Sequence, residues 1–530
     1  MGNRFSNVPD VNIRRSSFNR AHGLKTTFDA GYLVPIYVDE ALPGDTFNCK
    51  LSAFARLATP VAPIMDNIHM DTFFFAVPMR LIWENWQRFN GEQTNPEDST
   101  DYIIPVLDHT TEPLSSDGGF PVGSLSDYFG LPTGIQGIEG ISSMWHRAYN
   151  LIWNEWFRDQ NLQESVPVPT DDGPDNLNQF ELLRRGKRHD YFTSCLPWPQ
   201  KGPAVELPIG DSAPVLGQPD TAMHFENVPD YGPGIEFRYA RTNGDNSGVL
   251  DNYRGDITST GVNFPTDPDD TTVYADLSTA TASTINALRQ AFQIQRLYER
   301  DARGGTRYIE IIKSHFGVTS PDARLQRPEY LGGGRTPINV APIAQQSETN
   351  TTPLGTLGAM GTAASTGHGF RKSFTEHCIL IGMTCVTADL TYQQSLDRMF
   401  SRSTRWDFYW PSLANIGEQA VLNKEIYCDG SATDDDVFGY QERFAEYRYK
   451  PSRITGAFRS TYPTAIDQWH LGIEFGSVPA LNDSFIEENP PIDRVIAVPS
   501  EPHIIFDSYF DLNTVRPMPV SSVPGLIDHF

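Results

Sequence analysis

The run Ile68-His-Met-Asp-Thr-Phe-Phe-Phe-Ala-Val77, which Pro78 follows, is rich in the aromatic and β-branched residues that favour strands. Proline cannot donate to a sheet, so it marks the end of this strand. Upstream, Phe28–Val38 is rich in the same residue types, and Asp45–Leu57 alternates apolar with polar positions. The apolar positions of that alternation include Phe47, Cys49 and Leu51. We therefore expect three strands early in the chain.

Strand patterns return near the end of the chain, and helical patterns lie between the two groups. The late predicted strands are Phe374–Tyr392, Ala420–Cys428, Phe438–Lys450 and His503–Val515. Strands that open and close a chain, with helices in the connections, indicate a mainly β sandwich or barrel with elaborated loops.

The clearest helical pattern lies in Ser142–Asp159, where apolar residues recur every three or four positions. Ser142 or Ser143 is expected to cap its start. The stripe consists of Trp145, Ala148, Tyr149, Ile152, Trp153 and Trp156. The other predicted helices are a short one around Trp83 and Trp86, Thr284–Arg303 before Gly304, and Thr306–Phe316 before Gly317.

Composition excludes several classes of protein. The 530 residues include 31 Phe, 21 Tyr and 9 Trp, and so many aromatic side chains need a core, which excludes disorder for most of the chain. Length alone allows three or four domains. The 42 Gly and 40 Pro instead favour one large β architecture with long loops. The net charge of −25 argues against a protein built as a whole to bind nucleic acid, but leaves local patches open.

Membrane and secretory signals are missing from the sequence. No window of about 18 apolar residues is present, so we expect no membrane insertion. Met1–Asn12 is polar and lacks the apolar stretch of a secretory signal. The cysteines are odd in number and far apart, which suits reduced folding in a cytoplasm: Cys49, Cys195, Cys378, Cys385 and Cys428.

Catalytic and metal-binding motifs are also missing. The sequence has no phosphate loop, His-Glu-x-x-His, Cys-x-x-Cys or Gly-x-Ser-x-Gly motif, so we expect no enzyme, cofactor or metal. Gly332–Arg335 is predicted to be a loop, and a flexible turn is favoured over an anion cradle. Four residues are predicted to be structural: Cys378, Cys385, His146 and His315. Two acidic groups lack the calcium-loop pattern and are predicted to be solvated turns: Asp267, Asp269 and Asp270, and Asp434, Asp435 and Asp436.

Residues 1–27 are predicted to form a basic N-terminal arm. Residues 1–25 carry five cations and one acid, Asp10, in a chain that is otherwise strongly acidic, and apolar residues are sparse. Its isolated positive charge makes the arm a candidate for contact with DNA or with a neighbouring subunit. Its candidate contact residues are Arg14, Arg15, Arg20 and Lys25.

The segment Tyr440–Gly456 interleaves cations with aromatic residues. Such a pattern can stack bases and hold phosphates. Glu442 and Glu446 lie in the same run, however, and arginine–glutamate pairing across strands or subunits uses the same residues. Interface pairing is favoured over nucleic acid, and both remain open. The cations are Arg443, Arg448, Lys450 and Arg453.

Residues 204–283 differ from the rest, with 13 acidic residues against three arginines and many turn-forming residues. A segment of this composition cannot bury enough surface to offset its ordering entropy alone. A stretch this long without a structural period is usually a functional loop or a linker, so we expect a surface insertion. Its few apolar clusters include Tyr231, Ile235, Phe237 and Tyr239.

Several long motifs resemble the major capsid proteins of microviruses, and most of all those of the gokushovirus branch of small single-stranded DNA bacteriophages. The resemblance covers nearly the whole chain except residues 204–283. The motifs are Phe28-Asp-Ala-Gly-Tyr-Leu-Val-Pro-Ile, Leu42-Pro-Gly-Asp-Thr-Phe, Met65-Asp-Asn-Ile-His-Met-Asp-Thr-Phe-Phe-Phe-Ala-Val-Pro, Tyr191-Phe-Thr-Ser-Cys-Leu-Pro-Trp-Pro-Gln-Lys-Gly, the segment from Ser314 to Gly334, and the ending from Pro517 to Phe530.

This resemblance implies a viral jelly roll, an eight-stranded antiparallel β-sandwich or barrel with long helix-containing loops, built from residues 28–203 and 284–530. It implies sixty copies in a T=1 icosahedral shell around a circular single-stranded DNA genome. Residues 204–283 would form a threefold protrusion that contacts the host. We expect this insertion to face outward, because its carboxylates would repel packaged phosphates. Tyr231, Ile235, Phe237 and Tyr239 could then pack against symmetry-related copies or contact the host. The implied partners are an internal scaffolding protein, a small basic DNA-binding protein, a pilot protein and a host surface receptor, with assembly in the bacterial cytoplasm and no enzymatic activity.

A second class, a large β-sandwich carbohydrate hydrolase or lectin, is suggested only by acidity and aromatic content. It would require a signal peptide or a pair of carboxylates in a cleft. The sequence shows neither feature, so the capsid protein is the favoured hypothesis.

Overall fold

The computed structural model describes residues 14–108, 119–135, 138–203, 205, 215–217, 273–275, 285–305, 307–317, 326–350 and 353–521. It divides into two compact units, one made of Met1–Pro199 with Asp301–Phe530 and the other of Gln200–Arg300. The first unit holds a large antiparallel sheet.

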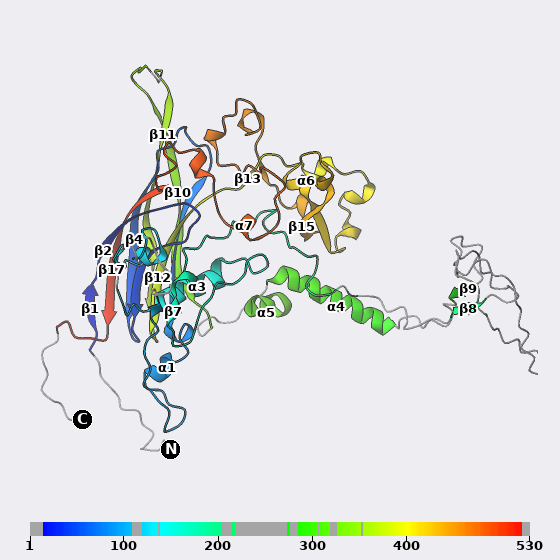
Figure 1. Cartoon of the computed structure of the whole chain (residues 1–530). Helices are drawn as coiled ribbons and strands as arrows, with labels where there is room; N and C mark the ends of the chain where they lie inside the picture. Colours follow the sequence, from blue (N-terminus) through cyan, green and yellow to red (C-terminus); the bar gives the residue numbers. More distant parts are fainter. Residues whose placement is uncertain are drawn as a thin grey trace, which may run out of the picture. The chain divides into compact units, whose positions relative to one another are not determined.

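Nine strands of the described residues form this sheet, in the order β1-β17-β4-β11-β10-β5-β12-β3, with β2 also paired to β17 (Figure 1). All of these pairings are antiparallel. The strands are β1 Ser16–Asn19, β2 His22–Phe28, β3 Val34–Ala41, β4 Thr46–Leu57, β5 Ile68–Pro78, β10 Glu329–Ala344, β11 Leu357–Ser373, β12 Cys378–Ala388 and β17 Ile504–Arg516.

The sheet curls into two facing layers, and β10 belongs to both. Its first part, Glu329–Ile338, pairs with β5. Its last part, Asn339–Ala344, pairs with β11. One layer therefore contains β2, β17, β4 and β11, and the other contains β5, β12 and β3. Eight long strands in this arrangement, with the short β1 added at one edge, form a jelly roll, so the fold predicted from the sequence is confirmed.

Aromatic side chains from both layers meet in the core between them. Tyr37 of β3 lies 5.3 Å, between ring centroids, from Phe510 of β17. Phe74 of β5 lies 5.4 Å from Phe370 of β11. Phe47, predicted to face inward from its alternation in β4, is fully buried. The alternation found in the sequence thus marks the inner face of the sandwich.

Helix α3, Met144–Ile152, covers the outer face of the second layer. Its Tyr149 and Ile152, with Trp153, join a cluster that includes Phe75 of β5 and Ile381 of β12. Because β12 is covered on both faces, all 11 of its residues are buried. The predicted helix Ser142–Asp159 is confirmed in its first part, and the chain continues as a π-helical turn over Trp153–Phe157.

The remaining elements are short or lie outside the jelly roll. The other α-helices are α1 Trp86–Phe89, α2 Leu125–Tyr128, α4 Ile285–Gly304, α5 Tyr308–Phe316, α6 Asn423–Ile426 and α7 Asp483–Ile486. The two-stranded pairings are β6 Leu107–Asp108 with β7 Asp175–Asn176, β8 Val215–Gly217 with β9 Val273–Ala275, β13 Thr391–Tyr392 with β16 Ser452–Arg453, and β14 Glu418–Leu422 with β15 Val437–Glu442.

The prediction of a loop at Gly332–Arg335 is wrong, because these residues lie inside β10. A Cβ atom added at Gly333 would collide with the carbonyl oxygen of Thr72 in β5, and one at Gly334 would collide with the ring of His368. The glycines therefore permit close packing between neighbouring segments of the sheet. Glycine is common both in turns and where strands pack closely, which explains why the sequence was interpreted as a loop.

Two late strands end earlier than predicted. Ala420–Cys428 is a strand only to Leu422, where α6 begins. Phe438–Lys450 is a strand only to Glu442, because Phe444 has a left-handed backbone with φ of 65° and turns the chain. Phe28–Val38 likewise divides between β2 and β3, with a turn at Gly31, whose φ is 87°. In each case local turns interrupt a run of strand-forming residues.

The described part of residues 1–27 belongs to the sheet. Ser16–Asn19 pairs with Asn513–Arg516, and His22–Phe28 pairs with Ile504–Phe510. These residues are extended, and backbone hydrogen bonds hold them at the edge of β17.

Candidate functional site

A third cluster of buried residues lies outside the jelly roll and supports a surface rich in arginine and aromatic side chains. Its core includes Phe192, Tyr392 and Phe438. The segment Arg398–Trp410 lies against the turn that follows β15. We call the following residues the arginine–aromatic surface: Arg402, Arg405, Trp406, Phe408, Tyr409, Trp410, Arg443, Phe444 and Tyr447.

Large aromatic side chains of this surface face solvent. Trp406 is 57% exposed, Phe408 50% and Tyr447 51%. Single exposed apolar residues are common in proteins, but a cluster of exposed aromatics marks an interaction site. Phe400, which is 68% exposed, lies next to this surface in the chain.

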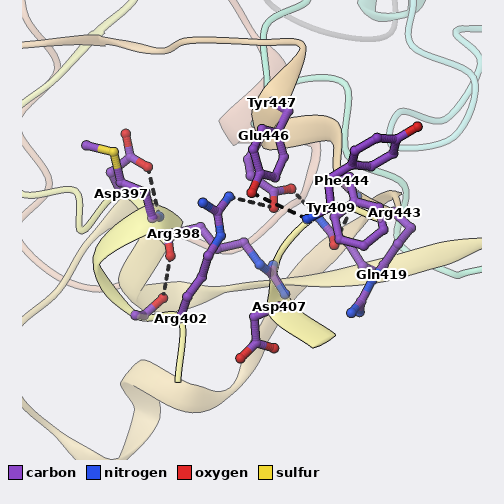
Figure 2. A network of polar contacts seen from close by, with 12 residues as sticks. Asp397, Arg398, Arg402, Asp407, Tyr409, Gln419, Arg443, Phe444, Glu446 and Tyr447 are labelled. Carbon is purple, nitrogen blue, oxygen red and sulfur yellow. Dashed lines mark hydrogen bonds and ion pairs between the residues drawn. The ribbon is translucent and has the colours of Figure 1, made fainter. Parts of the chain in front are cut away.

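Arg402 lies at the centre of the polar network (Figure 2). Its guanidinium group lies 4.3 Å from the ring centroid of Tyr447 and 5.4 Å from that of Phe408. It also donates to the carboxylate of Glu446 at 3.2 Å, and Gln419 donates to the other oxygen of that carboxylate at 2.7 Å. The side chains of Arg402 and Glu446 are only 10% and 8% exposed. This buried pair fixes the orientation of the rings around it.

Arg405 and Arg443 hold the other side of the surface. Arg405 lies 5.0 Å from the Trp406 ring and 5.2 Å from the Trp410 ring, and it makes no ion pair with any described residue. Arg443 donates to the carbonyl oxygen of Trp406 at 3.0 Å. Two exposed tryptophan rings beside one exposed arginine can pack against another planar or apolar group.

Phe444 has an unusual backbone that shapes this surface. Its φ of 65° is rare for a residue with a side chain. The ring lies 5.4 Å from Tyr409 in an edge-to-face arrangement, and its backbone N–H donates to Gln419. Such conformations persist only where the surroundings enforce them, and they cluster at functional sites.

The other cations predicted in this segment already have carboxylate partners. Arg448 pairs with Glu442, and both Lys450 and Arg453 pair with Asp397, at 2.7 and 2.8 Å. Burial raises the pKa of Asp397, but the hydrogen bond from Lys450 and the nearby charges outweigh it and leave the pKa below its ordinary value. Most of the positive charge in Tyr440–Gly456 is therefore neutralised within the chain.

The predicted N-terminal contacts lie elsewhere, along the edge of the sheet. Arg20 makes two hydrogen bonds with the carboxylate of Asp39, at 2.7 and 2.9 Å. Lys25 lies 3.4 Å from Asp507, and both side chains are exposed. Arg14 and Arg15 are exposed. These four residues stay candidates for contact with DNA or a neighbouring subunit. Tyr231, Ile235, Phe237 and Tyr239 lie outside the described residues.

The residues predicted to be structural are buried or paired. Burial raises the pKa of the Cys378 and Cys385 thiols to about 12 and lowers the pKa of His146 to about 3. His315 lies 2.7 Å from Asp301. Asp434 accepts from the backbone N–H groups of Asp429 and Gly430, so it closes a turn.

In the part of the chain that the structure describes, no three His, Cys, Asp or Glu residues are grouped to hold a metal. No described helix is long and apolar enough to cross a membrane.

The segment Arg398–Trp410 was not predicted from the sequence. It interleaves three arginines, at 398, 402 and 405, with five aromatic residues, at 400, 406, 408, 409 and 410, and this is the signal that singled out Tyr440–Gly456. The same criterion applied to the whole chain would have found both halves of the surface.

Comparisons with known proteins agree with this architecture. The family model described as "Capsid protein (F protein)" matches residues 6–526. "Capsid protein VP1" of Bdellovibrio phage phiMH2K is 50% identical, with 99% of this chain and 98% of that protein covered. The proteins of the same name from Chlamydia phage 1 and Spiroplasma virus 4 are 44% and 35% identical, and the matches cover 99% and 98% of this chain and 98% and 97% of theirs.

The family match and the three relatives each cover almost all of the chain, and the jelly roll and the exposed aromatic surface suit a protein that packs against others. The chain therefore belongs to the phage capsid protein (F protein) family, whose members are structural proteins rather than enzymes.

Proposed function

We propose that this chain is the major capsid subunit of a small phage, and that sixty copies assemble into a T=1 icosahedral shell around a circular single-stranded DNA genome. The observation that carries the proposal is the similarity to three capsid proteins over nearly the full length of every chain. The jelly roll supports it, because capsid subunits are a common use of this fold.

The arginine–aromatic surface is the contact between subunits that we assign first. Tyrosine, tryptophan and arginine are enriched at protein interfaces, and charged groups are depleted from interface centres. In this surface the rings other than that of Phe444 are exposed, whereas the charge of Arg402 is already paired with Glu446. A DNA-binding surface would instead need several cations free to replace counterions on phosphates. One observation favours DNA binding instead. Arg405 is exposed and makes no ion pair with any described residue, so it is free to contact a phosphate.

The test is the double variant Trp406→Ala/Trp410→Ala, which removes two exposed rings of this surface but leaves the buried Arg402–Glu446 pair. We expect particle yield to fall about tenfold or more, with unchanged unfolding of the isolated subunit, since exposed interface aromatics contribute to association and not to folding. Tyr462→Ala is the control, because Tyr462 is 51% exposed but lies outside this surface. Normal particles with less packaged DNA would assign the surface to the genome.

The remaining roles follow from the family resemblance and from charge. Residues 204–283 would face outward and bind a host surface receptor, and Arg14, Arg15, Arg20 and Lys25 would face the genome or a neighbour. Because each subunit carries a net charge of −25, the charge that neutralises the genome has to come from local patches or from a partner, and we propose a small basic DNA-binding protein as that partner. An internal scaffolding protein and a pilot protein complete the proposed partners, with assembly in the host cytoplasm and the mature protein in the virion.

A deletion tests the role of residues 204–283. Joining Pro203 to Thr284 through a short Gly/Ser linker should leave assembly intact and abolish attachment to host cells, because outward loops vary without disturbing a shell. Particle counts by electron microscopy and an adsorption assay separate the two effects. A folded subunit that no longer assembles would identify the segment as an assembly element, and unchanged adsorption would exclude the receptor role.

A further inference from the structure

The β10–β11 hairpin extends beyond the strands that flank it (Figure 1). The pairing of β10 with β5 ends at Ile338, opposite Ile68. The pairing of β11 with β4 begins only at Thr362, opposite Arg56. Between these points Val340–Ala344 and Leu357–Gly361 pair with each other and with no other described strand. We call Ala341–Ala344 and Pro353–Met360 the ribbon tip.

The ribbon tip exposes most of its apolar side chains, although Ala359 is buried. All four residues of Ala341–Ala344 are exposed, so solvent reaches both faces of this strand. Ile343 is 51% exposed, Leu354 65% and Leu357 41%. A two-stranded ribbon that no third strand extends is at best marginally stable in water. The tip is therefore incomplete in the isolated subunit.

Charge is nearly absent from this hairpin. In the 35 residues from Thr336 to Phe370 the one formally charged side chain is Glu348, whereas 20% of the whole chain is charged. Proteins usually protect a free strand edge with charged residues, especially lysine, and this edge has no lysine. Loss of charge combined with exposed apolar residues is typical of surface that becomes buried on association.

The same absence of charge identifies the partner. Two subunits with a net charge of −25 repel one another over most of their surfaces. An uncharged apolar ribbon is a place where identical subunits approach without this repulsion. We infer that the ribbon tip docks onto a second copy of this chain in the assembled particle, as a contact separate from the arginine–aromatic surface. The inference rests on the proposed self-assembly and adds the element that mediates it.

The test uses the full chain expressed with its scaffolding partner, with Ile343→Asp and Leu357→Asp as separate variants. Both positions are exposed, so a carboxylate is solvated in the free subunit but would be buried without a partner in the contact. We expect the thermal unfolding of the isolated subunit to stay unchanged and particle yield to fall about tenfold or more. Ile343→Leu, which keeps the apolar group, and Glu348→Gln, which removes the one charge, are matched controls that should assemble normally.

Each result decides the question. Normal particle yield from both aspartate variants would overturn the inference and leave the proposed function intact. Destabilised subunits would also overturn it, because the cover of the ribbon tip would then come from the same chain. Absence of particles from the unmodified chain would contradict the proposed function itself, and it is a different observation from a selective loss in the variants.

Discussion

Glu488 is a buried carboxylate with an incomplete set of hydrogen bonds. Its side chain accepts a long hydrogen bond from the backbone N–H of Ala388, at 3.4 Å, and its second oxygen is buried without a partner among the described residues. Burial raises the pKa of Glu488 to about 6 from an ordinary 4.5, although Ala388 and nearby cations oppose this. The folded state therefore holds a proton that the unfolded chain has already lost between these pH values.

This shift predicts how stability depends on pH. Because the folded state binds more protons, ionisation of Glu488 lowers the free energy of unfolding as pH rises from 4.5 to 6. Above that range the loss is about 2 kcal/mol. Glu488→Gln should raise the free energy of unfolding by about 1–2 kcal/mol at neutral pH, and the gain should vanish below pH 4.5. Urea unfolding at a series of pH values measures this. The exposed Glu501→Gln is the control, and a pH-independent difference would contradict the assignment.

The close packing of the β10 glycines predicts how their substitution affects stability. Gly333→Ala should lower the free energy of unfolding by about 1–3 kcal/mol, because the added methyl group would collide with the backbone of Thr72 in β5. Gly358→Ala in β11 is the matched control, since a Cβ atom there meets nothing within 4 Å. Chemical denaturation of the isolated subunits gives both values, and equal effects would mean that β10 and β5 are not packed this closely.

At helix α3, the prediction concerns the tryptophans. Trp153 is 5% exposed and its ring N–H donates to the carbonyl oxygen of Arg184 at 2.8 Å. Trp153→Ala should therefore destabilise the subunit by about 3–5 kcal/mol. Trp156→Ala should cost clearly less, because Trp156 is 37% exposed. Equal losses of stability would show that the helix does not bury its stripe against the second layer.

These elements show which parts of the fold the sequence could predict. Strand β4 was predicted because one of its faces is buried, so Phe47, Cys49 and Leu51 alternate with polar residues. Strands β10 and β11 were missed, because their glycines, alanines and threonines match a loop in composition. Gly333 has to be a glycine because the carbonyl oxygen of Thr72, more than 250 positions away in the sequence, leaves no room for a side chain. No local sequence pattern indicates such a contact.

The candidate surface was predictable to a similar degree. The interleaved cations and rings around Arg443 marked one half of it. Arg402 binds Glu446, although it lies 44 residues earlier in the chain. This contact depends on how β14 and β15 bring two distant segments together, so the sequence alone did not predict it. The sequence therefore left open whether the cations of this segment were free, and the structure gives Arg448, Lys450 and Arg453 partners in the same chain.

At the scale of the whole molecule, charge and exposed apolar surface have to be considered together. A subunit with a net charge of −25, with exposed rings at the arginine–aromatic surface and an uncharged ribbon tip, is suited to associate through these two patches, which carry little negative charge, while its remaining surface stays solvated. Added salt screens the repulsion between subunits. Assembly of the purified subunit should therefore become more favourable as ionic strength rises, which light scattering can follow. Weaker assembly in salt would indicate that ion pairs between subunits dominate.

Electron microscopy of the full chain expressed with its scaffolding partner tests the proposed function most directly. We expect uniform isometric particles whose reconstruction has T=1 symmetry, with the arginine–aromatic surface and the ribbon tip both buried between copies. Particles in which both surfaces face solvent would contradict the assigned contacts. A chain that stays monomeric, although folded, would contradict the central claim that it is a self-assembling shell subunit.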